Sequence, residues 1–244
     1  MREYMNVNIN ANISVNGSCP LTFSLAGTFT LVNGLLAATN VDSSISINAN
    51  RSISVISGSV VAPTIRMVSR LGSVTVGMDG SLRTSGMGSV STSSLVKGYG
   101  GSYGGSGGRS SHQCISAHNN PNIDNTRSFS NTPYQIGQID VSNDTSSAPM
   151  GSGGGPLSRG GGRVVIIAQN VQICGKIAAE GGNASDSLSR GYGAGSGGSI
   201  LVEAMESWQA MTTCSSGHLS VAGGAVLGGS DVGAGGGGRI TIKV

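Results

Sequence analysis

A tripeptide of the form Gly-x-Ile or Gly-x-Leu recurs along this 244-residue chain and limits what it can fold into. The four clear copies are Gly80-Ser81-Leu82, Gly137-Gln138-Ile139, Gly175-Lys176-Ile177 and Gly217-His218-Leu219. The aliphatic residues of the last three copies are 38 and 42 residues apart. Self-similarity at a period of about 20 to 50 residues is typical of repeat architectures. We therefore expect a stack of similar units.

Glycine-rich runs follow the tripeptides at residues 98–109, 151–163, 191–198 and 233–239. Three runs end in paired glycines before a strand-like segment, at Gly161-Gly162, Gly197-Gly198 and Gly237-Gly238. Low complexity alone would indicate flexible linkers. Recurrence at one phase of the repeat favours an ordered wall of stacked glycine segments. We expect glycine at the corners because it reaches positive φ without strain.

The N-terminal region shows a different signature. Residues 6–17 and 44–58 alternate between aliphatic and polar side chains, as half-buried strands do. The string INAN-ISV begins at Ile9 and INANRSISV at Ile47, an offset of 38 residues. This similarity predicts that one period runs through both ends of the chain. Gly34-Leu35-Leu36 is a candidate earlier copy of the tripeptide.

Short strands separated by glycine turns cannot each bury a face alone, but successive coils can stack identical positions at the sheet spacing of about 4.8 Å. The sequence therefore predicts an all-β fold, a right-handed parallel β-helix with repeats of about 40 residues and glycine-rich excursions. A minimal coil needs about 20 residues. Each repeat is thus either two small coils or, as we expect, one coil with an excursion.

We expect a single β-helix over residues 1–244 that is a segment of a longer chain. Its regions are Asn- and Ser-rich alternating coils at 6–95, a glycine run with an inserted loop at 96–133, and Gly-x-Ile/Leu coils at 134–244. The interval from Leu82 to Ile139 is 57 residues, and we assign the excess to a polar loop at 110–132.

The C-terminal cycle of paired glycine, strand, Gly-x-Ile/Leu and glycine run resembles the repeats of parallel β-helix surface proteins. It is similar to filamentous-haemagglutinin-type adhesins and to glycine-rich β-helix repeats in large surface proteins of protists and plants. The resemblance covers residues 134–244 and reaches 6–95 only through period and alternation. It implies a non-catalytic extracellular or cell-surface role in adhesion or in building a fibre or layer. Glycans or other surface proteins are the partners that such a role implies.

Strand-like sequence near both ends leaves strand edges open to another chain. Self-association or end-to-end stacking is therefore expected. The net charge of +3 is not clustered, and only 4% of residues are aromatic, so nucleic-acid binding is not expected. No run approaches the length of a membrane-spanning helix, so no direct membrane insertion is expected in this segment.

A β-helix can also carry carbohydrate chemistry, which needs a pair of carboxylates. The one candidate pair is Asp140 and Glu180, which lie one repeat apart near the Gly-x-Ile strands but differ in phase relative to their tripeptides. We therefore expect no catalytic residues and no enzyme. The alternative is a carbohydrate-binding or carbohydrate-processing β-helix of the pectin-lyase-like kind, with its site in the 110–132 loop.

That loop holds the one cluster of metal-ligand residue types, His112, Cys114 and His118, with Asp124 nearby. Zinc sites need three or four such ligands. We interpret the cluster as a polar loop and expect no metal and no cofactor. His112, His118 and Asp124 remain the candidate ligand residues.

Cys174 and Cys214 are 40 residues apart and each precedes a tripeptide. If one repeat is one coil, they lie about 5 Å apart, within disulfide range. If one repeat is two coils, they are about 10 Å apart and cannot bond. The pair is a candidate disulfide, with buried free thiols as the alternative. Sequons that permit N-glycosylation occur at Asn12, Asn16, Asn50, Asn143 and Asn183.

Overall fold

The computed structural model describes residues 4–89, 150–151, 153–154, 158–185, 193–205, 211–227 and 233–244. These residues form strands and no helix, which confirms the all-β class. The strands are β1 (Tyr4–Ile9), β2 (Ile13–Val15), β3 (Leu21–Leu31), β4 (Leu35–Ala38), β5 (Ser44–Ala49), β6 (Ile53–Val55), β7 (Ser59–Val61), β8 (Thr64–Ser69), β9 (Ser73–Val76), β10 (Ser81–Arg83), β11 (Arg163–Ala168), β12 (Asn170–Ile173), β13 (Lys176–Ala178), β14 (Ala184–Ser185), β15 (Ser199–Ala204), β16 (Met211–Thr213), β17 (His218–Ser220), β18 (Val226–Leu227) and β19 (Arg239–Lys243).

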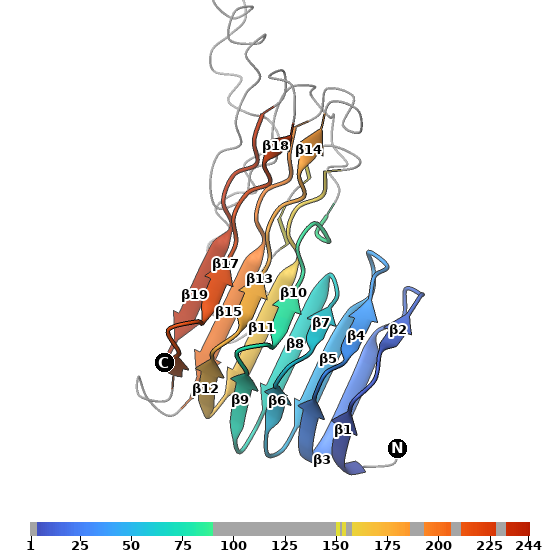
Figure 1. Cartoon of the computed structure of the whole chain (residues 1–244), viewed down its shortest axis with the longest axis vertical. Coiled ribbons are helices and arrows are strands. Elements are labelled where there is room, and N and C mark those ends of the chain that lie inside the picture. Colours follow the sequence, from blue (N-terminus) through green and yellow to red (C-terminus); the bar gives the residue numbers. More distant parts are fainter. Residues whose placement is uncertain are drawn as a thin grey trace, which may run out of the picture.

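Neighbours in each sheet are not consecutive in the chain. β5 pairs with β8, β6 with β9 and β7 with β10, all in parallel. An 11-stranded sheet runs β16-β12-β9-β6-β3-β5-β8-β11-β15-β19, with β1 beside β3, and a 6-stranded sheet runs β17-β13-β10-β7-β4-β2. The long strand β3 pairs with β5 through its first half and with β6 through its second. The chain therefore winds in successive coils along one axis (Figure 1).

The register shows three coil lengths, because Leu82 pairs directly with Ile177, 95 residues later. Leu36 pairs with Val60 and Val60 with Leu82, at separations of 24 and 22 residues. Ile177 pairs with Leu219, 42 residues later. Each C-terminal repeat is thus a single coil with an excursion, as expected. The expectation of a single period is wrong, because the N-terminal coils are shorter than the C-terminal ones. The two similar strings also occupy different places in the coil. Ile9 pairs with Leu31 in the second half of β3, whereas Ile47 pairs with the first half of β3 and with β8.

The tripeptide keeps one place in the coil. Gly34-Leu35-Leu36 is in phase with the later copies, and so is Gly58-Ser59-Val60, which carries valine instead of isoleucine or leucine. The third residue of these copies points inward, and Leu36, Val60, Leu82 and Ile177 are completely buried. The copy at Gly137 lies outside the described residues.

Close approach, not backbone freedom, explains these glycines. A Cβ added to Gly80 would lie 2.2 Å from the carbonyl oxygen of Val55, and one added to Gly175 would lie 2.1 Å from that of Gly80. Among the described glycines only Gly86 has a positive φ, of 64°. The expectation that the corners need positive φ is therefore wrong.

The core is a set of aliphatic columns parallel to the axis. Ile45, Ile65, Val164 and Ile200 follow one another in register through β5, β8, β11 and β15, and each is at most 1% exposed. Burying a side chain of this size contributes about 1.5–3 kcal/mol. Each coil thus depends on its neighbours for most of its burial.

The glycine runs form an ordered extension, here called the glycine slab. It consists of outgoing segments 179–183 and 221–225 and returning segments 158–162, 193–198 and 233–238. Figure 1 shows these segments above the main sheets, leading to β14 and β18. Gly162 N donates to Thr84 O at 2.7 Å and Gly198 N to Ala179 O at 2.7 Å, so each excursion returns beside the point where it left.

Hydrogen bonds in the slab follow a three-residue period. Ala194 N and Gly197 N donate to Gly233 O and Gly236 O, while Gly195 N and Gly198 N donate to Gly182 O and Ala179 O. In a β-strand, the backbone N–H groups would alternate in direction with period two. In an extended helix of three residues per turn, as in these segments, successive N–H groups point to different neighbouring segments. Residues 193–198 are buried. The expected ordered glycine wall is confirmed for these segments.

Candidate functional site

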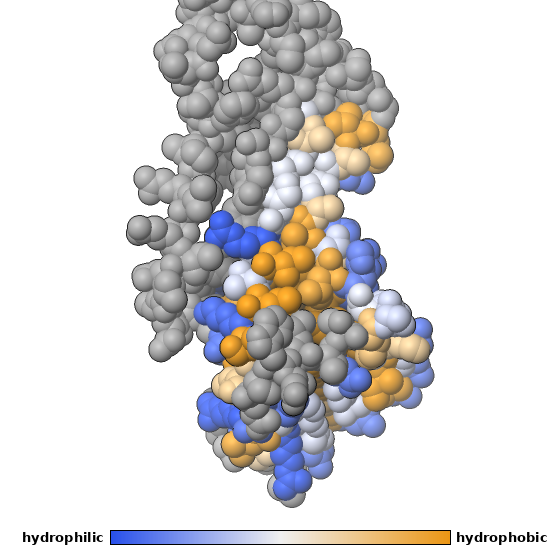
Figure 2. All heavy atoms as spheres, turned by 90° about the vertical axis from the view of Figure 1, so that its left-hand side faces the viewer, coloured by the Kyte–Doolittle hydropathy of each residue, from blue (hydrophilic) through white to orange (hydrophobic). Residues whose placement is uncertain are grey.

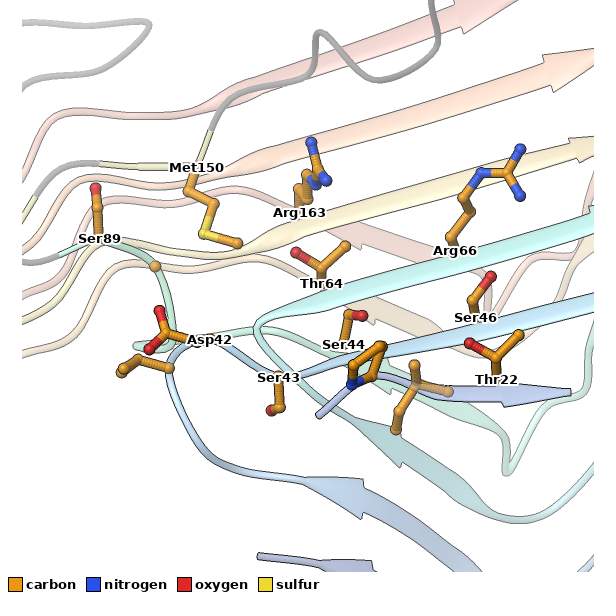
Figure 3. Close-up of a pocket in the computed structure, with 14 residues that line it drawn as sticks. Thr22, Asp42, Ser43, Ser44, Ser46, Thr64, Arg66, Ser89, Met150 and Arg163 are labelled. Carbon is orange, nitrogen blue, oxygen red and sulfur yellow. The ribbon is translucent and has the colours of Figure 1, made fainter. Parts of the chain in front are cut away.

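An open groove lies on the outward side of the large sheet, over β5, β8 and the start of β11. Its volume is about 760 Å³, within the usual range of ligand sites. Figure 3 shows its lining, which includes Thr22, the turn at 41–43, residues 44–46 of β5, Thr64 and Arg66 of β8, Ser89, Met150 and Arg163.

Two register columns place hydroxyl and guanidinium groups along the groove. One runs Thr22, Ser46, Arg66 across β3, β5 and β8. The other runs Ser44, Thr64, Arg163 across β5, β8 and β11. Each column has two short hydroxyl side chains followed by an arginine, so the floor is low and one wall is cationic.

Hydrogen bonds on the sheet face fix the first arginine. Arg66 Nη1 donates to Asn48 Oδ1 at 2.8 Å, and Asn48 Nδ2 donates to Ser46 Oγ at 3.2 Å. The guanidinium is therefore held beside the hydroxyl column before any ligand binds.

The second arginine, Arg163, opens β11 directly after the paired glycines. The sequence favours a solvated strand end there, but the structure places Arg163 half-buried in the groove wall. Burial lowers the pKa of its guanidinium from the usual value. Arg163 remains a cation near neutral pH, because arginine titrates only far above it.

Asp42 provides the one acidic side chain among the described lining residues. It lies in an exposed turn that Ser43 ties down, since Ser43 Oγ donates to Ala38 O at 2.9 Å and Asn40 O at 2.6 Å. The groove thus presents two guanidinium groups along one side and one carboxylate at its end.

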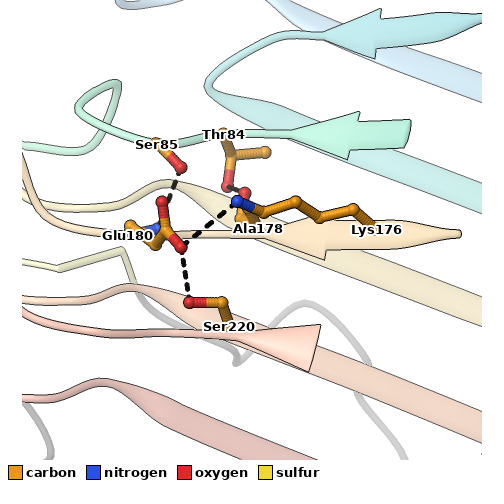
Figure 4. A network of polar contacts seen from close by, with 6 residues as sticks. All are labelled: Thr84, Ser85, Lys176, Ala178, Glu180 and Ser220. Carbon is orange, nitrogen blue, oxygen red and sulfur yellow. Dashed lines mark hydrogen bonds and ion pairs between the residues drawn. The ribbon is translucent and has the colours of Figure 1, made fainter. Parts of the chain in front are cut away.

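Glu180, one half of the candidate acid pair, takes part in a polar network instead (Figure 4). Ser220 Oγ donates to Glu180 Oε1 at 2.6 Å, Lys176 Nζ lies 3.6 Å from the same oxygen, and Glu180 N donates to Ser85 Oγ at 3.2 Å. The Ser220 hydrogen bond, with Lys176, holds the pKa of Glu180 below its usual value. The carboxylate joins its own coil to that of Ser220, and the backbone N of Glu180 joins the coil of Ser85. A carboxylate kept ionised in this way does not suit a general acid. Asp140 lies outside the described residues.

The structure contains a disulfide between Cys174 and Cys214, with a Cα–Cα distance of 4.6 Å. The two residues follow β12 and β16, which pair in adjacent coils. This is the spacing that one coil per repeat requires. Cys19 is an exposed free thiol.

The candidate ligand residues His112, His118 and Asp124 lie outside the described residues, as does the sequon at Asn143. Asn12, Asn16 and Asn183 are exposed and Asn50 is partly buried. Within the described ranges, no three potential ligands among histidine, cysteine and acidic residues gather into a metal site. No helix in that portion of the chain is long and apolar enough to cross a membrane.

Comparisons with protein-family models, with curated proteins and with solved structures find no match to this chain. Functional inference therefore rests on the fold and on the groove.

Proposed function

We propose that this chain is a non-catalytic structural or adhesive protein, a right-handed parallel β-helix that acts outside the cell or at its surface. The observation that carries the proposal is the uninterrupted parallel stacking of coils around buried aliphatic columns. Parallel crossover connections are right-handed in about 98% of cases, which supports the proposed hand. A rigid rod of this kind presents long faces built from short, repetitive sequence.

The Cys174–Cys214 disulfide supports the extracellular assignment. Disulfides persist in oxidising compartments and are rare in the cytosol. The exposed sequons at Asn12, Asn16 and Asn183 are compatible with the same location.

Assembly into a fibre or layer is included in the proposal. Ile240 and Ile242 continue two inward columns but are 40% and 42% exposed, because in the described structure β19 pairs only with β15. Figure 2 looks onto this end of the stack and shows apolar surface in the middle of it. Leu21 and Phe23 occupy the same two columns in β3. A second copy stacked head to tail would therefore continue both columns.

Electron microscopy of the purified chain at increasing concentration tests this assembly. Six strands of one face, spaced by about 4.8 Å, give an expected subunit rise of about 29 Å along a filament. The double variant Ile240→Lys/Ile242→Lys should abolish filaments and leave the monomer folded. Monomers only at every concentration, or a repeat unrelated to this rise, would refute the assembly.

The non-catalytic assignment has its own test. Incubation with a panel of neutral and acidic polysaccharides should release no oligosaccharides. Turnover of any of them would refute it and favour the carbohydrate-processing alternative.

A further inference from the structure

We propose that the groove over β5, β8 and β11 binds an anionic oligosaccharide, one that carries carboxylate or sulfate groups on a hydroxylated backbone. The site belongs to the folded monomer, so the proposal goes beyond the structural role and does not depend on assembly.

The two arginines set the charge and geometry of the ligand. Arg66 and Arg163 lie on neighbouring strands, offset by two residues, because Thr64 is the register partner of Arg163. At a strand spacing of about 4.8 Å and a rise of about 3.3 Å per residue, their Cα atoms are about 8 Å apart. Guanidinium forks match carboxylate and sulfate oxygens in a bidentate way. A ligand with two separated anionic groups fits this spacing better than a single small anion.

Arg66 has donors to offer. Among the described residues its one hydrogen-bonding partner is Asn48, through Nη1. A guanidinium carries five N–H donors, so the remaining ones are available to a ligand in the groove. Because Asn48 already fixes the side chain, binding costs little additional side-chain entropy.

The hydroxyl floor selects a polar, hydroxylated ligand. Thr22, Ser44, Ser46 and Thr64 each offer a hydroxyl that both donates and accepts hydrogen bonds. No aromatic side chain is among the described lining residues, so the groove lacks the stacking surface that unpaired nucleic-acid bases need. Its few apolar side chains, among them Val41 and Met150, do not form the apolar pocket that usually anchors a peptide.

Asp42 contributes to selectivity. Its carboxylate stands at the end of the groove away from Arg66 and repels a ligand that is anionic along its whole length. We therefore expect ligands with spaced charges to bind better than densely charged ones.

The experiment measures binding of three dextrans of equal length by isothermal titration calorimetry. They are carboxymethyl dextran with sparse substitution, dextran sulfate with the same sparse substitution, and unmodified dextran. The two anionic forms should bind and the neutral form should not. Affinity should fall as salt rises, because exposed charge pairs are screened.

Matched variants localise the site. Arg66→Gln should weaken binding by about tenfold or more, as expected for loss of charge-assisted hydrogen bonds. Arg70→Gln, an exposed arginine directly after β8 that does not line the groove, should leave binding unchanged. Asp42→Asn should improve binding of a densely sulfated dextran.

Three outcomes would overturn the proposal. They are equal affinity for neutral dextran, equal losses in Arg66→Gln and Arg70→Gln, and no binding of either anionic form at low salt. The thermal unfolding of each variant shows whether the fold is intact. None of these results bears on filament formation, so the two proposals fail separately.

Discussion

Two glycines of the slab, Gly195 and Gly237, lie in comparable returning segments but in different surroundings. A Cβ on Gly195 would lie 1.9 Å from the carbonyl oxygen of Arg159, whereas one on Gly237 meets nothing within 4 Å. The side-chain hydrogen of glycine is therefore indispensable only where two backbones touch.

Gly195→Ala should lower the free energy of unfolding by about 1–3 kcal/mol, the usual cost of overpacking. Gly237→Ala should be neutral or stabilise by up to about 1 kcal/mol, since alanine restricts the unfolded chain. Urea unfolding of both variants checks the difference. Equal effects would mean that the slab is not packed as described.

Glu180 gives the chain an acid-sensitive contact. Its pKa in the folded state is below the ordinary 4.5, chiefly because Ser220 donates to it. The ionised form is thus favoured by folding, and the contribution is fully present above about pH 4.5 and is lost as pH falls through the folded pKa.

The contribution should be at most about 1 kcal/mol, because the contact lies near the surface. Glu180→Gln should flatten the loss of stability in acid, as measured by unfolding between about pH 2 and pH 6. Glu203→Gln provides the control. If Glu180→Gln lost stability in acid as steeply as the parent protein, the assignment would be contradicted.

At the scale of the element, the disulfide ties the coil that contains β12 to the coil that contains β16. It closes a loop of 40 residues, and cross-links of this size stabilise by about 2–4 kcal/mol. The double variant Cys174→Ala/Cys214→Ala should unfold at lower urea concentration by a corresponding amount. Cys19→Ser should not, since that thiol is exposed and free. If reductant left the parent protein unchanged, the bond would be absent or without effect.

Some of the element pattern is readable from the sequence. A specific combination of glycine and aliphatic residues recurs along the chain. This recurrence predicts the phase of the tripeptide, the equivalence of the paired glycines and the single coil between Ile177 and Leu219. The strings at Ile9 and Ile47 are misleading, because any half-buried strand alternates with period two. Alternation identifies a strand but does not say which strand it pairs with.

The groove was beyond reach of the sequence. Its columns join Thr64 to Arg163, 99 residues apart, across a segment whose length follows no repeat. In the sequence, short hydroxyl residues at outward positions are indistinguishable from those of any solvated strand face. Only the register shows that arginines of the next coils lie beside them. An outward Ser or Thr followed one coil later by arginine is the signal that a register-aware search would detect.

At the scale of the whole molecule, each coil packs only against its two neighbours, as in other stacked repeats. Removal of residues 44–63 takes out one complete coil, because Ser44 and Thr64 are register partners. Leu21 would then pair with Ile65, and Leu36 with Leu82, so every inward column is preserved.

This shortened chain should remain folded, with an unchanged circular dichroism signature and a smaller denaturant m-value, since less surface is exposed on unfolding. Removal of 44–58 takes out β5 and β6 but keeps β7, so it removes an incomplete coil and should destabilise the fold more than the 44–63 deletion does. If the 44–63 deletion also failed to fold, one coil could not take the place of another in the stack.

The hydrogen bond from Gly162 to Thr84 has a practical meaning for this architecture. Between these two residues the chain leaves the coil and returns to the same spot, so the coil stays closed whatever the length of the excursion. The returning segment 158–162 is part of the glycine slab and has to be kept. A foreign domain whose own termini lie close together is therefore best inserted further out on the excursion, where it would be displayed from the side of the rod.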